Sequence, residues 1–504
     1  IPSLTLAQTG KCSNHREGSV LINAIIIKRV PALHRSIRPQ PRRKLVAMPA
    51  LMLLIVAGLS GCKLSPLASD SQLIGCSSAA DRIQITQNSH LDPSCVYTGG
   101  FDISTSNVTL DCRNALIQAQ GSTGLRGIAI AAPEDTALTG VTVRSCHVEG
   151  FLNSLRILRE GFRSFEQGEE YLTPTDQILL EKNYFSKSHG VGVYIDAYVS
   201  GVTVQKNLIA EAGSTGIYLE TGSRRNTIEQ NFIVNNGFRE NGPDGQLATL
   251  NGIDFWFWGV GREGLAIDGS YENTVRRNVF AGNSAGGLFL YKNCGEFPES
   301  PRYFERRFPS DNNVIERNLF WGGRNGVWVG SRMGENTLPM ECTDDAYIQE
   351  PVRRVVLDFA ADNTIRSNVF RDVTYGIRIE DDGNKVIGNS FFSADPDSHA
   401  VIIGTPDRTE VLGQPVTGTV LKYNIAHISG NKFPYRWVHG HDETVSKLNR
   451  ALGRTVELCE GEPPPRQPLI FVIAADVAGP GGTPPDTTPD LTVPTLSALE
   501  DCPN

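Results

Sequence analysis

Two short patterns of apolar and polar residues recur along the middle of the chain. In the first, a β-branched residue is followed by two polar residues, an asparagine and an apolar pair, as in VTVQKNLI at 202–209. The asparagines of seven copies are Asn183, Asn207, Asn231, Asn278, Asn318, Asn368 and Asn389. Their spacings are 24, 24, 47, 40, 50 and 21. The basic period is therefore the short spacing of about 21 to 24, and the longer steps mark inserted loops.

The second pattern is glycine followed by an apolar, a variable and an apolar residue. This alternation predicts a strand with one buried face. Its copies are GIAI (127–130), GVYI (192–195), GIYL (216–219), GIDF (252–255), GLFL (287–290), GVWV (326–329) and GIRI (376–379).

Short strands separated by Gly and Asn turns, with almost no helical periodicity, predict an all-β parallel β-helix. Inward Ile, Val, Leu and Phe of successive coils would form one continuous core, and the recurring Asn would form a stacked ladder at one bend. A β-propeller needs about 40–50 residues per repeat, and a leucine-rich solenoid needs a Leu-dominated consensus. Neither alternative matches.

These repeats resemble the right-handed β-helix family of carbohydrate-binding proteins and sugar hydrolases. Pectate lyases, polygalacturonases, alginate and chondroitin lyases and mannuronan epimerases share its architecture. The resemblance covers about residues 80–430 and implies a single-stranded right-handed parallel β-helix with a polysaccharide partner. It is specific for the fold only, because many activities use this scaffold. The signature motifs of polygalacturonases, mannuronan epimerases and pectate lyases are absent.

The segments that flank the repeats divide the chain further. Residues 62–79 are expected to form a tether, and residues 76–125 to contain the N-terminal cap and first coils. Residues 431–459 are expected to cap the other end of the solenoid. From 460 to 504 the chain is rich in Pro, Gly and Thr, which predicts a disordered tail.

The first 61 residues have the features of upstream sequence plus an export signal. Arg42, Arg43 and Lys44 precede an apolar run, which is too short to span a bilayer. The run ends in Leu-Ser-Gly-Cys at Cys62, which resembles the lipobox of bacterial lipoproteins. This resemblance implies an acyl anchor, such as palmitate, on Cys62. Lys63 after the cysteine implies the outer membrane of a Gram-negative bacterium.

Charge excludes one class of partner. Residues 1–61 hold nine of the 47 Lys and Arg and one of the 55 Asp and Glu, so the remainder has 38 bases, 54 acids and a formal charge of -16. Such an acidic chain repels phosphate, so no nucleic-acid partner is expected. The same charge disfavours an anionic sugar, unless a basic patch or a bound cation reverses it locally.

Eight cysteines remain when Cys12 and Cys62 are set aside. An even number in an exported chain suggests disulfides, although sequence does not determine their connectivity. Pairing of neighbours is our working expectation: Cys76–Cys95, Cys112–Cys146, Cys294–Cys342 and Cys459–Cys502.

Outward residues of the glycine-containing strand should align from coil to coil and form two columns. The first column contains Tyr194, Tyr218, Asp254, Phe289, Trp328 and Arg378, and the second contains Asp196, Glu220, Trp256, Tyr291, Gly330 and Glu380. Carboxylates mixed with aromatic rings suit the binding of sugars, whose apolar faces stack on such rings. Alternatively, the rings pack beneath loops as a satellite core.

Long insertions surround these coils at 236–250, 256–272, 291–312 and 330–362. Three of them directly follow the aligned strand, so they could form the walls of a groove above it.

Catalysis would fall to acids on neighbouring rungs. Asp196 and Glu220, with Asp254 beyond them, would lie ~5 Å apart, which fits the paired carboxylates of a glycosidase. The same acids could hold Ca²⁺, which binds oxygen ligands. The alternative is a solvated edge of the ladder.

Basic residues supply further candidates. In lyases of related fold, Ca²⁺ neutralises the substrate and a Lys or Arg removes the proton, which makes Lys187, Lys292 and Arg224 candidate bases. His189 is a candidate general base, although a lone His in a turn is more often structural. His439, His441 and Asp442 have the residue types of a metal site outside the repeat. Arginines at 302–307, including Arg306, could form local anion contacts.

Three functions follow from these observations. The chain could be a lipid-anchored enzyme that cleaves or remodels a polysaccharide, with hydrolase and lyase ranked close together and epimerase third. It could instead bind sugar without catalysis, or it could be a structural protein of the cell envelope.

Overall fold

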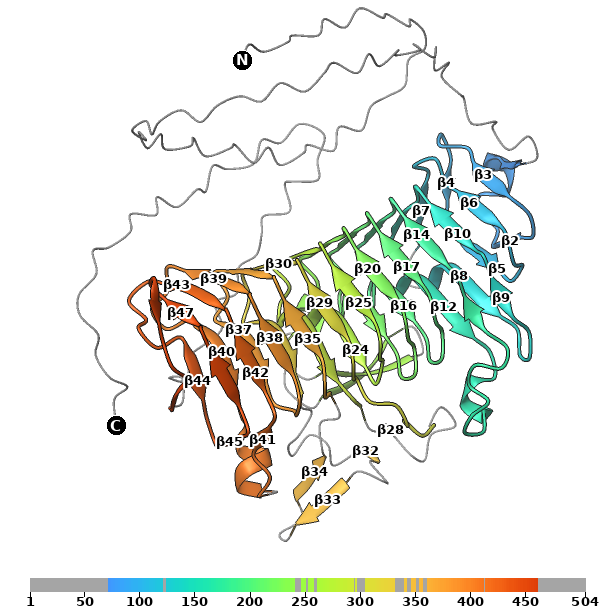
Figure 1. Cartoon of the computed structure of the whole chain (residues 1–504). Helices are drawn as coiled ribbons and strands as arrows, with labels where there is room; N and C mark the ends of the chain where they lie inside the picture. The colour runs from blue at the N-terminus through green and yellow to red at the C-terminus, as the bar shows by residue number, and fades with distance from the viewer. Residues whose placement is uncertain are drawn as a thin grey trace, which may run out of the picture. The chain divides into compact units, whose positions relative to one another are not determined.

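A computed structural model shows that the chain forms a single-stranded right-handed parallel β-helix (Figure 1). The structure describes residues 71–120, 124–240, 246–250, 253–257, 261–293, 295–296, 304–330, 340–341, 346–349, 353–356, 360–411 and 413–460. In Figure 1 the coils follow one another from the blue first strands to the red last ones. This confirms the fold that the repeats predicted.

The strands form three 13-stranded sheets, and every coil between the first and the last contributes one strand to each. Sheet 1 contains β1 (Gln72–Ile74), β3 (Ser89–Leu91), β6 (Thr109–Asp111), β10 (Thr142–Arg144), β14 (Leu179–Glu181), β17 (Thr203–Gln205), β20 (Thr227–Glu229), β25 (Thr274–Arg276), β29 (Val314–Glu316), β35 (Thr364–Arg366), β38 (Lys385–Ile387), β42 (Val420–Lys422) and β46 (Val445–Lys447). Sheet 2 contains β4 (Val96–Tyr97), β7 (Leu116–Gln118), β11 (His147–Glu149), β15 (Tyr184–Ser186), β18 (Leu208–Ala210), β21 (Phe232–Val234), β26 (Val279–Ala281), β30 (Leu319–Trp321), β36 (Val369–Arg371), β39 (Ser390–Ser393), β43 (Ile425–Ile428), β47 (Arg450–Ala451) and β48 (Arg454–Thr455). Sheet 3 contains β2 (Ile83–Ile85), β5 (Phe101–Ile103), β8 (Arg126–Ala132), β12 (Asn153–Arg159), β16 (Val193–Ile195), β19 (Ile217–Leu219), β24 (Glu263–Asp268), β27 (Gly286–Tyr291), β31 (Asn325–Val329), β37 (Tyr375–Ile379), β40 (His399–Ile403), β44 (Tyr435–Trp437) and β49 (Cys459–Glu460).

Smaller elements lie between these strands. Two parallel pairs join β9 (Leu138–Thr139) to β13 (Thr175–Asp176) and β41 (Val416–Thr417) to β45 (His441–Asp442). Three antiparallel pairs join β22 (Gln246–Leu250) to β23 (Ile253–Phe257), β28 (Gly295–Glu296) to β32 (Met340–Glu341), and β33 (Ala346–Gln349) to β34 (Arg353–Val356). The helical turns are η1 (Cys76–Ser78), η2 (Phe162–Ser164), η3 (Phe238–Glu240) and η5 (Asp407–Val411). No helix in this part of the chain is long and apolar enough to cross a membrane.

The core is a set of apolar stacks along the helix axis. In the middle coils, Phe280, Phe320, Phe370 and Phe391 are buried with neighbouring ring centroids 4.9, 4.9 and 4.7 Å apart. These distances match the ~4.8 Å spacing of paired strands, because each ring lies directly above the next.

The predicted asparagine ladder is present, and it is longer than expected. It runs through Asn183, Asn207, Asn231, Asn278, Asn318, Asn368, Asn389, Asn424 and Asn449. At each step, for example Asn207 to Asn231, the side-chain amide donates to the next Oδ1 at 3.0 Å and the backbone N–H donates to the same oxygen at 2.9 Å. Each ladder amide is therefore satisfied only when its neighbours are in register.

Two further ladders occupy other bends. One runs through Asn226, Asn273, Asn313, Asn363 and Asn384, and the other joins Asn236 to Asn283. The repeats indicated one ladder, whereas the structure has an amide ladder at more than one corner of the coil.

The solenoid continues beyond the limits of 80 and 430 that the repeats gave. β1 pairs with β3, so the β-helix begins inside the segment assigned to a tether. Residues 431–459 carry β44, β46 and β47, which extend all three sheets, and β48 then turns back antiparallel on β47. Cys62 and the tail from 461 lie outside the described residues.

Two of the four expected disulfides are present, Cys76–Cys95 and Cys112–Cys146. Each joins two successive coils at the N-terminal end of the solenoid. Cys294, Cys342 and Cys502 lie outside the described residues, so the other two pairs stay predictions.

The central ladder residue Asn278 offers a test of the register constraint. It accepts hydrogen bonds from the backbone and side-chain amides of Asn231 and donates to the carbonyl of Ile228 at 2.8 Å. Asn278→Ala leaves these buried groups without partners and should lower the free energy of unfolding by about 3 kcal/mol. Thr274→Ala, on the same coil but half-exposed, should change it by less than ~0.5 kcal/mol. Equal effects of the two variants in denaturant titrations would contradict the ladder's role.

Candidate functional site

The outward column of sheet 3 differs from the expected one at a single coil. Strand pairing places Tyr194, Tyr218, Ala266, Phe289, Trp328 and Arg378 in one row. Asp254 and Trp256 instead belong to β23, which pairs with β22 in a separate two-stranded sheet. Their placement in the column was wrong.

The reason for this error is the side of the strand on which the loop is inserted. In this coil the insertion precedes β24, whereas in the next two coils it follows the strand. The true copy of the second pattern is GLAI at 264–267. Gly264 precedes Asn278 by nearly the same interval as Gly216 precedes Asn231, whereas the interval from Gly252 is much longer.

The corrected register brings a third acid into the second column. Asp196, Glu220 and Asp268 directly follow the paired residues Ile195, Leu219 and Ile267. The three carboxyl groups therefore lie on successive rungs, at the same end of sheet 3. Asp268 is the acid that sequence reasoning missed.

Arg156 holds the first acid. It lies one rung before Tyr194, and its Nη2 donates to Asp196 Oδ1 at 2.7 Å while its Nε donates to Oδ2 at 3.1 Å. Its guanidinium carbon also lies 4.5 Å from the centroid of the Tyr194 ring. Burial raises the pKa of Asp196 despite the nearby Arg156.

Arg306 joins the other two acids. Its Nη1 contacts Glu220 Oε1 and lies 3.2 Å from Asp268 Oδ2. The arginine comes from the segment 304–308, which covers the acids of the neighbouring coils. The expected anion contact in this basic stretch is thus a contact with the protein's own carboxylates.

Tyrosines and an asparagine complete the hydrogen bonds of this pair. Tyr194 donates to Glu220 Oε2 at 2.5 Å, and Tyr218 donates to Asp268 Oδ2 at 2.5 Å. Asn293 donates to Asp268 twice, from its backbone and side-chain amides, at 2.6 Å each. The two tyrosine rings stack with centroids 5.1 Å apart.

The two carboxyl groups titrate differently. Burial raises the pKa of Asp268 to about 6, and the charge of Glu220 adds to this effect, although Arg306 opposes it. Burial acts in the same direction on Glu220, but Arg306 and the hydrogen bonds from Tyr194 and the Thr221 amide outweigh it and lower its pKa. When the pKa values of two adjacent carboxyl groups are pushed apart, one can act as a proton donor while the other stays ionised.

Access to this group is limited. Asp268 is 0% exposed and Glu220 is 5% exposed. Tyr218 and Tyr291, which were expected to form an exposed platform, are buried with Phe289 in a satellite cluster, while Tyr194 and Trp328 are half-buried. The aromatic column therefore packs largely on itself and on inserted segments.

The other predicted bases lie apart from the acids. His189 lies in the turn before β16, whereas Asp196 follows that strand. The residue is largely exposed, but partial desolvation of its ring and the charge of nearby Arg239 lower its pKa. Lys187 pairs with Glu149 on sheet 2 at 3.5 Å. Arg224 lies over the Tyr171 ring and donates to Tyr271 at 3.0 Å. Lys292 follows the column residue Tyr291 and interacts electrostatically with Asp311.

Arg324, Trp328 and Arg378 lie on or beside the later rungs of sheet 3 and form what we call the basic and aromatic surface. Arg378 pairs with Glu380 and lies 5.7 Å from the centroid of the half-buried Trp328 ring. Arg324 lies close enough to repel it, and burial with this repulsion lowers the pKa of Arg324. No described residue forms an ion pair with Arg324.

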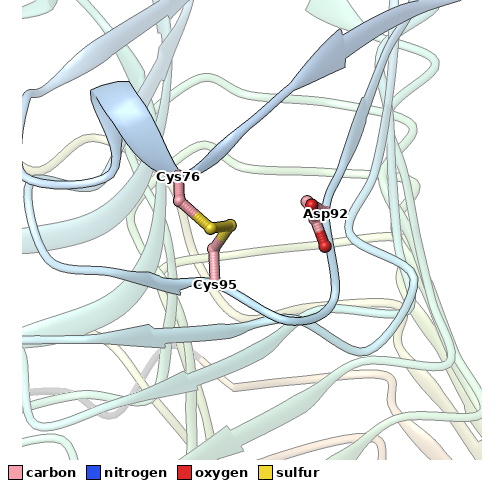
Figure 2. A group of neighbouring side chains, drawn as sticks. All are labelled: Cys76, Asp92 and Cys95. Carbon is pink, nitrogen blue, oxygen red and sulfur yellow. A yellow bond between two sulfur atoms is a disulfide. The ribbon is translucent and has the colours of Figure 1, made fainter.

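Metal-binding geometry is found at one place in the described residues. Cys76, Asp92 and Cys95 have ligand atoms within 4.8 Å of one another (Figure 2). The two sulfurs are bonded to each other in a disulfide, so neither is a thiolate ligand. Of the acids predicted to hold Ca²⁺, Asp196 and Glu220 pair with Arg156 and Arg306 instead. In the third candidate set, His439 contacts Glu410 at 2.9 Å and His441 packs edge-on against Trp437.

The fold defines the class of this chain as a right-handed parallel β-helix protein. A family model for the right handed beta helix region matches residues 83–258. No curated protein matches the chain.

Several solved structures have a similar fold. One is the A-module of the mannuronan C-5 epimerase AlgE4 of Azotobacter vinelandii, with 12% identity, a TM-score of 0.40, and coverage of 77% of this chain and 92% of that chain. Another is the catalytic domain of a GH87 alpha-1,3-glucanase, with 11% identity, a TM-score of 0.39, and coverage of 77% and 63%. An alginate lyase from Paenibacillus sp. str. FPU-7 has 10% identity, a TM-score of 0.28, and coverage of 75% and 99%. Likeness at this level assigns no activity.

The raised pKa of Asp268 predicts a dependence of stability on pH. Its folded pKa of about 6 exceeds the unfolded value of ~3.9, so the folded state binds more protons between these values. This contribution is fully present below the unfolded pKa and is lost as pH rises through about 6, on the order of 3 kcal/mol. Asp268→Asn should therefore flatten the fall in stability between these pH values. Parallel stability curves for the two proteins would contradict the assignment.

Proposed function

We propose that this chain acts on a polysaccharide lying along sheet 3, with Asp268 as its general acid and Glu220 as its nucleophile. The observation that carries the proposal is their placement on adjacent rungs, in contact with the same nitrogen of Arg306, with pKa values shifted in opposite directions. Strands in register place them ~5 Å apart, which suits the carboxyl pair of a retaining glycosidase.

In this proposal Asp268 protonates the leaving oxygen of the glycosidic bond while the Glu220 carboxylate bonds to the anomeric carbon. Water then hydrolyses this glycosyl ester, and Asp268 takes back the proton. Asp268 holds its proton up to about pH 6, because burial disfavours its charge. Arg306 and Tyr194 keep Glu220 ionised. Substrate reaches the pair when the segment 304–308 moves aside, since that segment supplies the arginine above it.

The basic and aromatic surface would hold a sugar beside this pair. Trp328 offers a ring for stacking, and Arg324 and Arg378 supply positive charge on an otherwise acidic chain. We infer that acidic sugars bind here in preference to neutral ones, since the local charge is reversed.

A non-catalytic protein is the second candidate. The observation that favours it is that each acid of the column already has an arginine partner and is buried. In that case the group holds the inserted segment against the solenoid, and sugar binds without turnover or the chain is a structural part of the cell envelope.

Turnover distinguishes these candidates. The chain is incubated with neutral and uronate polysaccharides, with and without Ca²⁺, while new reducing ends and the ultraviolet absorbance of unsaturated products are measured. Reducing ends alone indicate a hydrolase, and absorbance indicates a lyase. Glu220→Gln and Asp268→Asn should each lower kcat at least ~100-fold and leave glycan binding intact. Asp381→Asn, which changes another buried acid paired with an arginine, should retain activity. Absence of turnover with intact binding selects the second candidate.

The pH profile supplies a separate expectation. If Asp268 is the proton donor, kcat should fall as pH rises through about 6, because the acid form is then lost. A profile that stays flat across this pH would exclude Asp268 from that role.

We further propose that Cys62 carries the lipid anchor and places the β-helix at the outer membrane. The support is the apolar run before Leu-Ser-Gly-Cys and the short connection from Cys62 to β1. Cys62→Ser should abolish incorporation of labelled palmitate and release the chain from the membrane fraction, whereas Cys12→Ser should change neither. Retained label in Cys62→Ser would contradict this proposal.

A further inference from the structure

The outer faces of the three sheets differ in chemistry. Sheet 1 presents threonines and cross-strand ion pairs such as Arg144–Asp111, Arg276–Glu229 and Arg366–Glu316. Sheet 3 carries the acids and the inserted segments. Sheet 2 instead presents a row of apolar residues to solvent.

This apolar stripe follows one register column through successive coils. Its members are Val96, Leu116, His147, Tyr184, Leu208, Phe232, Val279, Leu319, Val369, Ser390 and Ile425. Val96, Phe232, Val369 and Ile425 are 47%, 44%, 38% and 37% exposed, and Trp321 in the neighbouring column is 40% exposed. Half of the ten large exposed apolar side chains in the described part of the chain therefore lie on this one face.

The size of the face suits a protein partner. Eleven rungs at ~4.8 Å extend about 50 Å, and two outward columns with the flanking turns give on the order of 800 Å². A stable dimer buries about 800 Å² on each partner, so the face is large enough for a second protein.

The order of residues along the face makes it complementary to itself. In the column that contains Val234, we compare the residues that lie the same number of rungs before and after β21. Two rungs away, the small, buried Ser186 lies on one side and the large, exposed Trp321 on the other, so the face is recessed at Ser186 and raised at Trp321. Three rungs away, acidic Glu149, which also lies 3.5 Å from Lys187, is on one side and basic Arg371 on the other. A two-fold axis along β21 would therefore place a small residue against a large one and an acid against a base.

We propose that two copies of this chain pair through the apolar stripe, with their solenoids antiparallel about an axis at Phe232. Each Phe232 then packs on its counterpart, and each Glu149 faces the Arg371 of the second copy. Arg371 is exposed and forms no ion pair with any described residue, so it is available to this contact. The pairing is independent of the sugar site, because it uses a different sheet.

The test measures the mass of the purified chain in solution by sedimentation and light scattering. The chain should be a dimer, and Phe232→Glu and Trp321→Glu should each weaken dimerisation about tenfold or more, because each buries a charge in the apolar contact. Leu172→Glu, at a site that is 74% exposed outside the stripe, should remain dimeric. Circular dichroism confirms that each variant is folded.

Cysteine crosslinking tests the antiparallel arrangement. Phe232→Cys should crosslink with itself, whereas Glu149→Cys and Arg371→Cys should crosslink only when the two variants are mixed. A monomeric parent chain, or self-crosslinking of Glu149→Cys, would overturn the proposal. Binding of a monomer to anionic lipid vesicles that is lost in Phe232→Glu would also overturn it and assign the stripe to a membrane surface.

Discussion

Registration of one coil upon the next is the constraint on which this structure depends. Each ladder amide, such as Asn231, satisfies its donors and acceptor only through the coils above and below it. The residue before a ladder asparagine adopts a left-handed backbone, as at Lys206 and Arg277, with φ of 56° and 57°. These conformations are unfavourable for long side chains in isolation, so the hydrogen bonds of the bend must hold them in place.

The acid column is a direct consequence of this register. Three strands whose last core residues, Ile195, Leu219 and Ile267, are each followed by an acid are stacked in register, so Asp196, Glu220 and Asp268 lie on successive rungs. Their mutual repulsion and burial would be costly without Arg156 and Arg306, which neutralise the group from a neighbouring coil and from an inserted segment. The same packing separates the pKa values of Glu220 and Asp268, because Arg306 contacts Glu220 more closely.

The outer faces of the three sheets differ in chemistry and therefore suit different contacts. The threonines and ion pairs of sheet 1 suit water, the insertions over sheet 3 bury polar groups beside aromatic rings, and sheet 2 leaves apolar side chains open to contact. A nearly straight solenoid does not fold back over its own outer face. A long apolar row on that face is therefore either covered by a partner or exposed to solvent. One scaffold thus supports a site and an independent interface.

The repeated patterns by themselves determined the fold, the inward core, the main asparagine ladder and the positions of Asp196 and Glu220. The repeat length and the alternation of apolar and polar residues can be read from short stretches of sequence. Stacking of the coils then places equivalent residues directly above one another. The sequence left the disulfide connectivity open, and the structure confirmed the expected neighbour pairs Cys76–Cys95 and Cys112–Cys146. Tertiary structure decided which of two similar phrases, at 252 or at 264, enters sheet 3, because an insertion can lie on either side of a strand. It also decided that Arg156 and Arg306 hold the acids and that Tyr218 and Tyr291 are buried, since these contacts join segments whose spacing follows no period.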